Sequence, residues 1–237
     1  MHPIERLRFV ARTGWAGPSV LAAEAAWALA DLAEREAPAL VPACRRLLDR
    51  QPGCGPLWWL AARVLSAGEP VSEAQRCARE LENDPTPTLM LEALPPGARA
   101  VRQGGIGEVV GADLVVVEVG ALGPSGMVAD ASCSGLLDAA HAAEVPVWVE
   151  AGVGRVLPTA LWESMSGRFG APHAQSRPGA LPGVRTPNVR IPATRGHSTL
   201  FGHRGIEQVV GPNGAQSLAI ALSGSDCPEP PELLEGF

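Results

Sequence analysis

Two apolar segments near the middle of the chain, ADLVVVEV (residues 112–119) and VPVWVEA (residues 145–151), constrain the fold more than any other feature. Both are rich in β-branched residues and neither alternates apolar with polar side chains, so each is expected to be a strand that is covered on both faces. Between them, Ser132 or Ser134 can cap a helix that ends near Ala143. This order predicts a βαβ unit with a right-handed crossover and a parallel sheet.

The N-terminal part of the chain, residues 1–83, is expected to be helical. From Pro18 to Glu36, apolar residues recur at spacings of three and four, and Ser19 is the predicted N-cap. Ser72 is the predicted N-cap of a later helix. Further helices are predicted over residues 38–49, 56–67 and 72–83. These helices are amphipathic, so they must pack on one another or on the second half of the chain.

Beyond residue 84 the pattern changes from helical to strand-like. Short strands are predicted at TLMLEAL (88–94), ARAV (98–101) and IEQVVG (206–211), and DCPEPPELL (226–234) is predicted to be an extended tail with a short helical turn. Residues 166–205 are rich in Gly, Pro, Arg and Ser, and predict a long loop. The predicted class is therefore α/β, with a helical region at 1–84 and a small Rossmann-like parallel-sheet domain at 85–237.

The basic residues exclude several functions. The chain has 19 Lys and Arg residues together, and every one is Arg; it also has no Tyr. A Schiff base, a lysine general base and a P-loop lysine are therefore excluded. The net charge is −6 and there is no basic block, so nucleic acid is not expected as a principal partner. The five cysteines are widely spaced without a CxxC pair, which indicates reduced thiols rather than disulfides or a zinc site, and no cofactor is expected.

No segment of the sequence favours a membrane. The richest apolar stretch, residues 20–32, is interrupted by Glu24 and Asp31, so it is too short and too polar to span a bilayer. The N-terminal MHPIERLRF carries charges where a signal peptide needs its apolar run. We therefore expect a cytoplasmic protein.

The segment EVGALGPSGMVADAS (118–132) is predicted to be a ligand-binding loop. It follows the first apolar strand, where ligands bind in open parallel sheets, and its glycines would let the backbone approach a ligand closely. The backbone N–H groups that begin the next helix can face an anion, for which phosphate is the natural candidate. The alternative is an ordinary turn at Gly-Pro-Ser-Gly. The predicted ligand-binding residues are Gly120, Gly123, Gly126, Ser132 and Ser134.

The segment RGHSTLFGHRG (195–205) gathers two histidines and two arginines. His197 and His203 could bind a metal together with a carboxylate, although no third ligand is evident nearby. Alternatively, Arg195 and Arg204 could receive a phosphate. The remaining alternative is a basic loop in solvent.

The order of these segments resembles a known family. That family contains the alpha, beta and delta subunits of eukaryotic translation initiation factor 2B, methylthioribose-1-phosphate isomerase and ribose-1,5-bisphosphate isomerase. Its pattern is a strand ending in Gly-Ala-Asp, a Gly loop, Asn-Lys-x-Gly-Thr, a helix and Val-Pro-Val-x-Val. The tail at 226–234 is similar to the family's Asp-x-x-Pro-Pro-x-Leu, and residues 6–29 are similar to its first helices. The resemblance implies assembly through the α/β domain, so a homodimer is expected.

The departures from the family pattern imply a function without catalysis. Residues 118–120 stand at the Gly-Ala-Asp position, and Asp130 replaces the lysine of Asn-Lys. The position of the isomerases' catalytic aspartate matches about Gly126, and no cysteine lies between Ala78 and Ser132, where their catalytic cysteine would fall. The resemblance thus implies a non-catalytic protein that binds a phosphorylated metabolite or a protein partner.

The alternative hypothesis is a divergent aldose-ketose isomerase acting on a ribose phosphate. Its catalytic candidates are Glu118, Asp130 and Cys133. Isomerisation needs an acid and a base across the sugar carbons, and the start of a helix at Cys133 would lower the pKa of that thiol.

Overall fold

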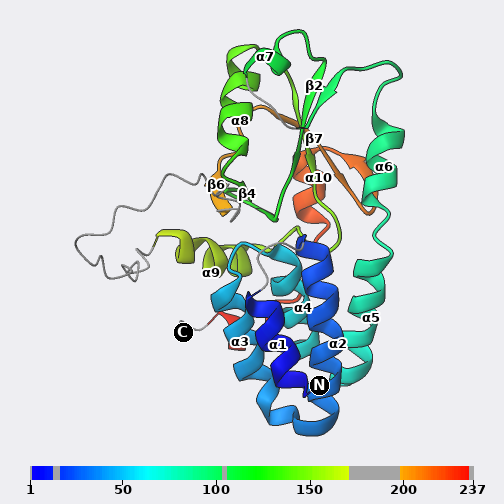
Figure 1. The fold of residues 1–237 in the computed structure, drawn as a ribbon, viewed down its shortest axis with the longest axis vertical. Coiled ribbons are helices and arrows are strands. Elements are labelled where there is room, and N and C mark those ends of the chain that lie inside the picture. Colours follow the sequence, from blue (N-terminus) through cyan, green and yellow to red (C-terminus); the bar gives the residue numbers. More distant parts are fainter. Residues whose placement is uncertain (1, 13–16, 103–105, 171–197, 235–237) are drawn as a thin grey trace, which may run out of the picture.

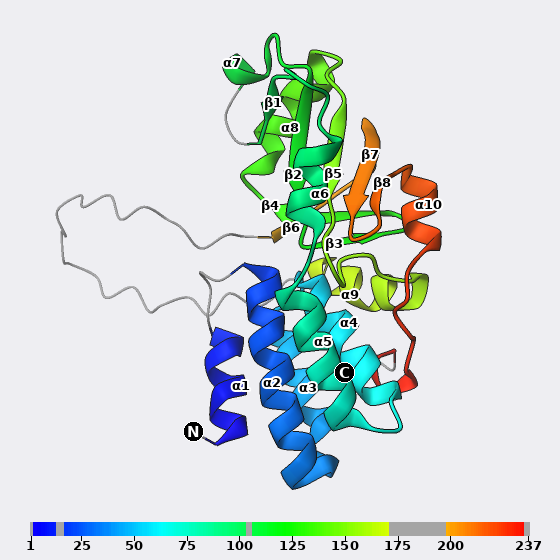
Figure 2. The same cartoon turned by 90° about the vertical axis from the view of Figure 1, so that its right-hand side faces the viewer.

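The structure, a computed structural model, describes residues 2–12, 17–102, 106–170 and 198–234. It is an α/β fold with an N-terminal helical region and a mixed sheet of mostly parallel strands, as predicted. The helical region and the sheet lie at opposite ends of the molecule in both views (Figures 1 and 2). None of the described helices combines the length and the hydropathy needed to cross a membrane.

The helices predicted in the first 83 residues are present, with shifted ends. They are α1 (Pro3–Arg12), α2 (Pro18–Glu36), the 3-10 turn η1 (Ala37–Ala39), α3 (Leu40–Arg50), α4 (Gly55–Ser66) and α5 (Pro70–Glu82). The predicted caps Ser19 and Ser72 were wrong, because Gly17 and Glu69 are the N-caps of α2 and α5. A proline occupies the first turn of both helices, where it needs no hydrogen-bond donor, and it starts each helix before the serine.

The helix α6 (Thr86–Ala93) replaces the strand predicted at 88–94, so that prediction was wrong. Asp84 lies two residues before the helix, and its Oδ1 accepts a hydrogen bond from the N–H of Thr86 at 2.9 Å. Met90 of α6 is fully buried against Leu114 and Trp148 of the sheet. A short apolar run of this length fits a strand and a buried helix equally well, and tertiary packing selects the helix.

The main sheet has five strands in the order β1-β2-β5-β7-β8. They are β1 (Ala100–Val101), β2 (Leu114–Glu118), β5 (Val147–Glu150), β7 (Ile206–Gly211) and β8 (Gly214–Gln216). The first four are parallel, and β8 returns antiparallel to β7. The strand predicted at 206–211 is thus confirmed, and the one predicted at 98–101 is confirmed over residues 100–101. The predicted βαβ unit is β2, α8 (Cys133–Ala142) and β5.

Helices cover both faces of this sheet, which explains its apolar strands. Val115, Val117 and Val149 pack on one face in a cluster that includes residues of α8 and α10 (Leu218–Ser223). Leu114 and Val116 point to the other face, toward α6. Strands buried on both faces need no polar alternation, as the sequence predicted.

A second, three-stranded sheet replaces the loop predicted at 118–132. Its strands are β3 (Ala121–Gly123), β4 (Gly126–Asp130) and β6 (Ser198–Phe201), all antiparallel. Burial of Leu122 and Met127 makes the hairpin more favourable than an open loop. The loop predicted at 166–205 was also wrong at its ends, where α9 (Thr159–Gly170) and β6 lie; its residues 171–197 are outside the described residues.

The C-terminal tail runs back to the helical region as an extended segment with the 3-10 turn η2 (Pro231–Leu233), as predicted (Figure 2). Arg45 of α3 holds it: Nε and Nη2 donate to the carbonyl of Glu232 at 3.0 and 2.8 Å. Leu233 is buried in the same core cluster as the N-terminal helices. This cluster includes residues from both parts of the chain. The division into a helical region at 1–84 and an α/β domain at 85–237 stays a prediction.

Candidate functional site

The hairpin of β3 and β4 lies between the carboxyl end of β2 and the helical region, at the position predicted for a ligand. The N–H of Gly55, at the start of α4, donates to the carbonyl of Gly120 at 2.8 Å. A side chain at Gly120 would place its Cβ 2.5 Å from the carbonyl oxygen of Gly53. The absence of a side chain at Gly120 therefore lets the backbone of residues 53–55, at the start of α4, pack closely against it.

The other two glycines of the hairpin also face protein atoms. A Cβ at Gly123 would lie 2.1 Å from Cδ2 of Trp162 on α9, and one at Gly126 would lie 2.5 Å from the carbonyl oxygen of Phe201. The indole Nε1 of Trp162 donates to Ser125 Oγ at 2.7 Å and fixes the ring over the hairpin turn. Packing thus accounts for both glycines, and a ligand contact at either stays a prediction.

Glu118, the last residue of β2, is engaged by Arg155, a residue that sequence reasoning missed. Arg155 Nη2 lies 2.8 Å from Glu118 Oε1, and the Arg155 side chain is 7% exposed against 58% for Glu118. Nη1 donates to the carbonyl of Val119 at 2.6 Å, and Nη2 to Ser19 Oγ at 3.2 Å. The same guanidinium therefore joins the carboxyl end of β2, the residue that follows it and the first turn of α2.

The charge of Arg155 is balanced within the chain. A buried cation near the N-terminal end of a helix is unfavourable, because the helix dipole is positive there. The carboxylate of Glu118 and the two oxygen acceptors offset that cost, although Nε of Arg155 is buried without a hydrogen-bond partner. The chain itself therefore occupies and neutralises the junction between the helical region and the sheet.

Asp130 holds the turn that leads from β4 into α8. Its Oδ1 accepts a hydrogen bond from the N–H of Ser132 at 2.8 Å, and the N–H of Ser134 donates to the carbonyl of Ala131 at 3.2 Å. Ser132 is the N-cap residue of α8 but makes no side-chain capping bond. Two N–H groups predicted to face an anion are thus used internally, and the Asp130 carboxylate would repel an anion placed beside them.

The thiol of Cys133 has the opposite pKa shift from the one predicted. Cys133 is half-buried, and burial raises the pKa of its thiol; the carboxylates of Asp130 and Glu118 raise it further. The other four cysteines are buried and free, and burial raises the pKa of Cys44, Cys54 and Cys77 to about 12. These thiols are protonated near neutral pH, unlike an activated nucleophile.

We expect alkylation of the native protein by iodoacetamide to reach Cys133 first and slowly at about pH 7, and to accelerate as the pH rises beyond the ordinary thiol pKa of about 8.5. The reason is that the raised pKa leaves little thiolate at neutral pH. Peptide mass mapping across this pH range measures the rates. A fast rate at Cys133 that does not change between about pH 6 and 8 would indicate a thiolate and contradict this expectation.

Part of the histidine and arginine segment is described: its residues 198–201 form β6, which pairs with β4 and places Ser198 opposite Asp130. Arg195 and His197 lie outside the described residues. Arg204 is exposed in the turn before β7, at the amino end of the parallel strands, whereas Glu118 lies at their carboxyl end. His203 is half-buried and its Nε2 has no hydrogen-bond partner. Within the described residues, no group of three or more His, Cys, Asp and Glu side chains could hold a metal ion.

A cavity of about 280 Å³ lies farther along the carboxyl edge, beyond the ends of β5 and β7, and sequence reasoning missed it. Trp59 and Glu80 line it from the helical region, and Asp226 from the C-terminal tail. The glycine-rich loop 152–154 and the turn 211–214 complete it. The signal in the sequence was a glycine close to the end of each of two strands, Gly152 for β5 and Gly211 for β7.

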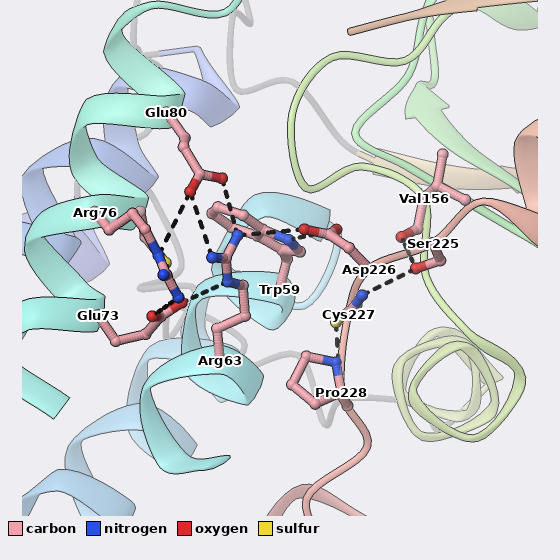
Figure 3. Close-up of polar contacts among 11 residues, drawn as sticks. Trp59, Arg63, Glu73, Arg76, Glu80, Val156, Ser225, Asp226, Cys227 and Pro228 are labelled. Carbon is pink, nitrogen blue, oxygen red and sulfur yellow. Dashed lines mark hydrogen bonds and ion pairs between the residues drawn. The ribbon is translucent and has the colours of Figure 1, made fainter. Parts of the chain in front are cut away.

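The acidic side of this cavity is tied to Arg63 of α4 (Figure 3). Arg63 forms ion pairs with Glu73 at 2.6 Å, Glu80 at 2.8 Å and Asp226 at 3.3 Å. The Trp59 ring lies under its guanidinium, 4.6 Å from ring centre to Cζ, and Trp59 Nε1 donates to Asp226 Oδ1 at 3.1 Å. The network connects α4, α5 and the tail. The positive charge of Arg63 is therefore neutralised by carboxylates of the same chain.

Comparison by sequence finds no relative: no family model matches the chain, and no curated protein matches it. Comparison by structure finds chains with a similar fold. The translation initiation factor eIF-2B of Pyrococcus horikoshii OT3 is similar at a TM-score of 0.65 and 15% identity, covering 90% of this chain and 96% of that chain.

Two structures from Chaetomium thermophilum are similar to the same degree. The eIF2B beta subunit has a TM-score of 0.66 and 12% identity, covering 99% of this chain and 93% of its own. The tetrameric eIF2B-beta2-delta2 complex contributes a chain with a TM-score of 0.67 and 11% identity, covering 93% of this chain and 92% of that chain. At these identities the likeness establishes the fold, which is the one that the sequence resemblance implied.

Proposed function

We propose that this chain, which has the fold of the translation initiation factor 2B subunits, is a non-catalytic protein that acts by binding a protein partner. The observation that carries the proposal is the occupied junction at the carboxyl end of β2. There Arg155 is buried and paired with Glu118, and it also bonds Val119 and Ser19. Fold alone does not transfer activity, so the proposal depends on the chemistry of these residues.

The three catalytic candidates lack the properties that isomerisation requires. An acid and a base must face the substrate with pKa values near the working pH. Glu118 is in an ion pair, Asp130 accepts a backbone hydrogen bond in a turn, and the pKa of Cys133 is raised. These groups therefore serve the structure of the junction.

A protein partner fits this geometry better than a phosphorylated metabolite does. Protein atoms already face the hairpin glycines, and Asp130 places negative charge at the start of α8. A similar fold occurs in a tetrameric complex of beta and delta subunits, which are proteins that assemble with one another. A second copy of this chain, bound through the α/β part, is the first candidate partner.

A phosphorylated metabolite is the second candidate, and one observation favours it. Arg155 keeps Nε without a partner and lies beside the first turn of α2, so two sources of positive potential meet at the junction. A phosphate that displaced Glu118 from Arg155 would use both. Arg204 stays outside this arrangement, at the other edge of the sheet.

Two measurements on the purified chain separate these candidates. Sedimentation equilibrium is expected to give a dimer, twice the chain mass of 24.6 kDa. A thermal-shift titration with ribose phosphates, methylthioribose phosphate and nucleotides is expected to give no shift, whereas a ligand at 100 times its Kd would add about 2.7 kcal/mol.

A saturable shift with one phosphorylated compound would instead establish the second candidate. A monomer over the whole concentration range would exclude a second copy of the chain as the partner.

A further inference from the structure

The helical region contains a second cavity, far from the junction in the fold. It has a volume of about 730 Å³ and lies between α1, α3 and the turn that joins α2 to α3. The helices α1 and α3 lie beside one another in Figure 1, and residues of the two helices are in contact. We call it the α1–α3 cavity. Its floor is apolar, because Leu7, Leu32 and Leu47 line it and are buried at 6%, 1% and 3% exposure.

Two arginines form the α3 side of its rim. Arg46 and Arg50 both line the cavity and are both exposed, and they are one helical turn apart. Within the described residues, neither has an ion pair with a carboxylate. Two of the neighbouring charges are already paired: Arg8 pairs with Glu5, and Asp49 pairs with Arg168 at 2.7 Å.

The spacing of Arg46 and Arg50 suits a carboxylate ligand. Like charges four residues apart repel and destabilise a helix, and an anion between them removes that cost. A guanidinium offers two parallel N–H groups that match a carboxylate. Glu36 and Asp49 are the acidic residues of the lining. The carboxylate of Glu36 repels an anion and would keep it on the α3 side of the rim.

We propose that the α1–α3 cavity binds an amphipathic organic carboxylate, with its alkyl or aryl body on the leucine floor and its carboxylate on Arg46 and Arg50. The volume lies within the range of roughly 300–1,000 Å³ that is usual for small-molecule sites. Apolar walls with a few placed polar groups are the usual composition of such sites. This site is separate from the junction and does not depend on the proposed function.

Calorimetric titration of the full chain with decanoate below its micelle concentration tests the proposal, with decyltrimethylammonium as the cation that carries the same tail. The variant is Arg46→Gln together with Arg50→Gln, which keeps the helix and removes both charges. The matched control is Arg79→Gln, an exposed arginine of α5 outside the cavity. Ala43→Leu, on the cavity wall, fills the space without changing charge.

Saturable binding of decanoate is expected in the native chain and in Arg79→Gln, with Kd raised at least tenfold in the double variant and in Ala43→Leu. The cation is expected not to bind. Absence of decanoate binding would overturn the proposal. Equal binding of decanoate and the cation, or equal affinity in the double variant and the native chain, would overturn it as well.

Discussion

Replacing Gly123 with alanine is expected to lower the free energy of unfolding by about 3 kcal/mol, because the added methyl group overpacks the hairpin. Its Cβ would lie 2.1 Å from Cδ2 of Trp162. The indole cannot move aside freely, since it is 2% exposed and its Nε1 bonds Ser125 Oγ. Urea denaturation followed by circular dichroism measures the change.

The control is Gly135→Ala, at a glycine inside α8 whose added Cβ would meet nothing within 4 Å. That change is expected to raise stability by about 0.5–1 kcal/mol, because alanine favours the helix. Equal effects at the two glycines would contradict the packing of α9 on the hairpin. A stable Gly123→Ala protein would show that this glycine is free to serve a ligand.

Replacing Arg155 with alanine is expected to cost about 3 kcal/mol of stability, because it leaves the Val119 carbonyl without its guanidinium partner and opens a cavity at the junction. Arg155 is 6% exposed, so bulk water does not reach these groups freely. Denaturation at low and high salt measures the loss, which should persist in high salt, since buried interactions are screened little.

Arg204→Ala is the control, because it removes the same side chain at an exposed position. Its effect is expected to stay within about 0.5 kcal/mol. An Arg155→Ala protein as stable as the native chain would contradict a structural role for Arg155. A more stable variant would indicate a charge kept for binding an anion.

The strands β2 and β5 could be predicted from the sequence because burial on both faces leaves a local signature. The residues 114–118 and 147–150 are apolar without alternation, and α8 fits between them. The hairpin of β3 and β4 was predicted only in part: the alternative of an ordinary turn at Gly-Pro-Ser-Gly is confirmed, and the two strands beside it were not predicted. Its glycines suit close approach to a ligand or to protein, and the sequence does not distinguish the two.

The role of Arg155 could not be predicted, because its partners are distant in the chain. Ser19 lies 136 residues away and Val119 lies 36 residues away, and only the tertiary fold brings them together. The pKa of Cys133 was predicted from the helix dipole alone. The direction of the shift follows instead from burial of the thiol and from the carboxylates of Asp130 and Glu118.

Turnover of methylthioribose-1-phosphate and ribose-1,5-bisphosphate by the purified chain, followed by phosphorus NMR, decides whether this protein is catalytic. The occupied junction predicts no conversion above a sample without protein. Conversion by the native chain that is lost in Asp130→Asn or Cys133→Ser, with the fold intact by circular dichroism, would contradict a non-catalytic function and establish the isomerase alternative.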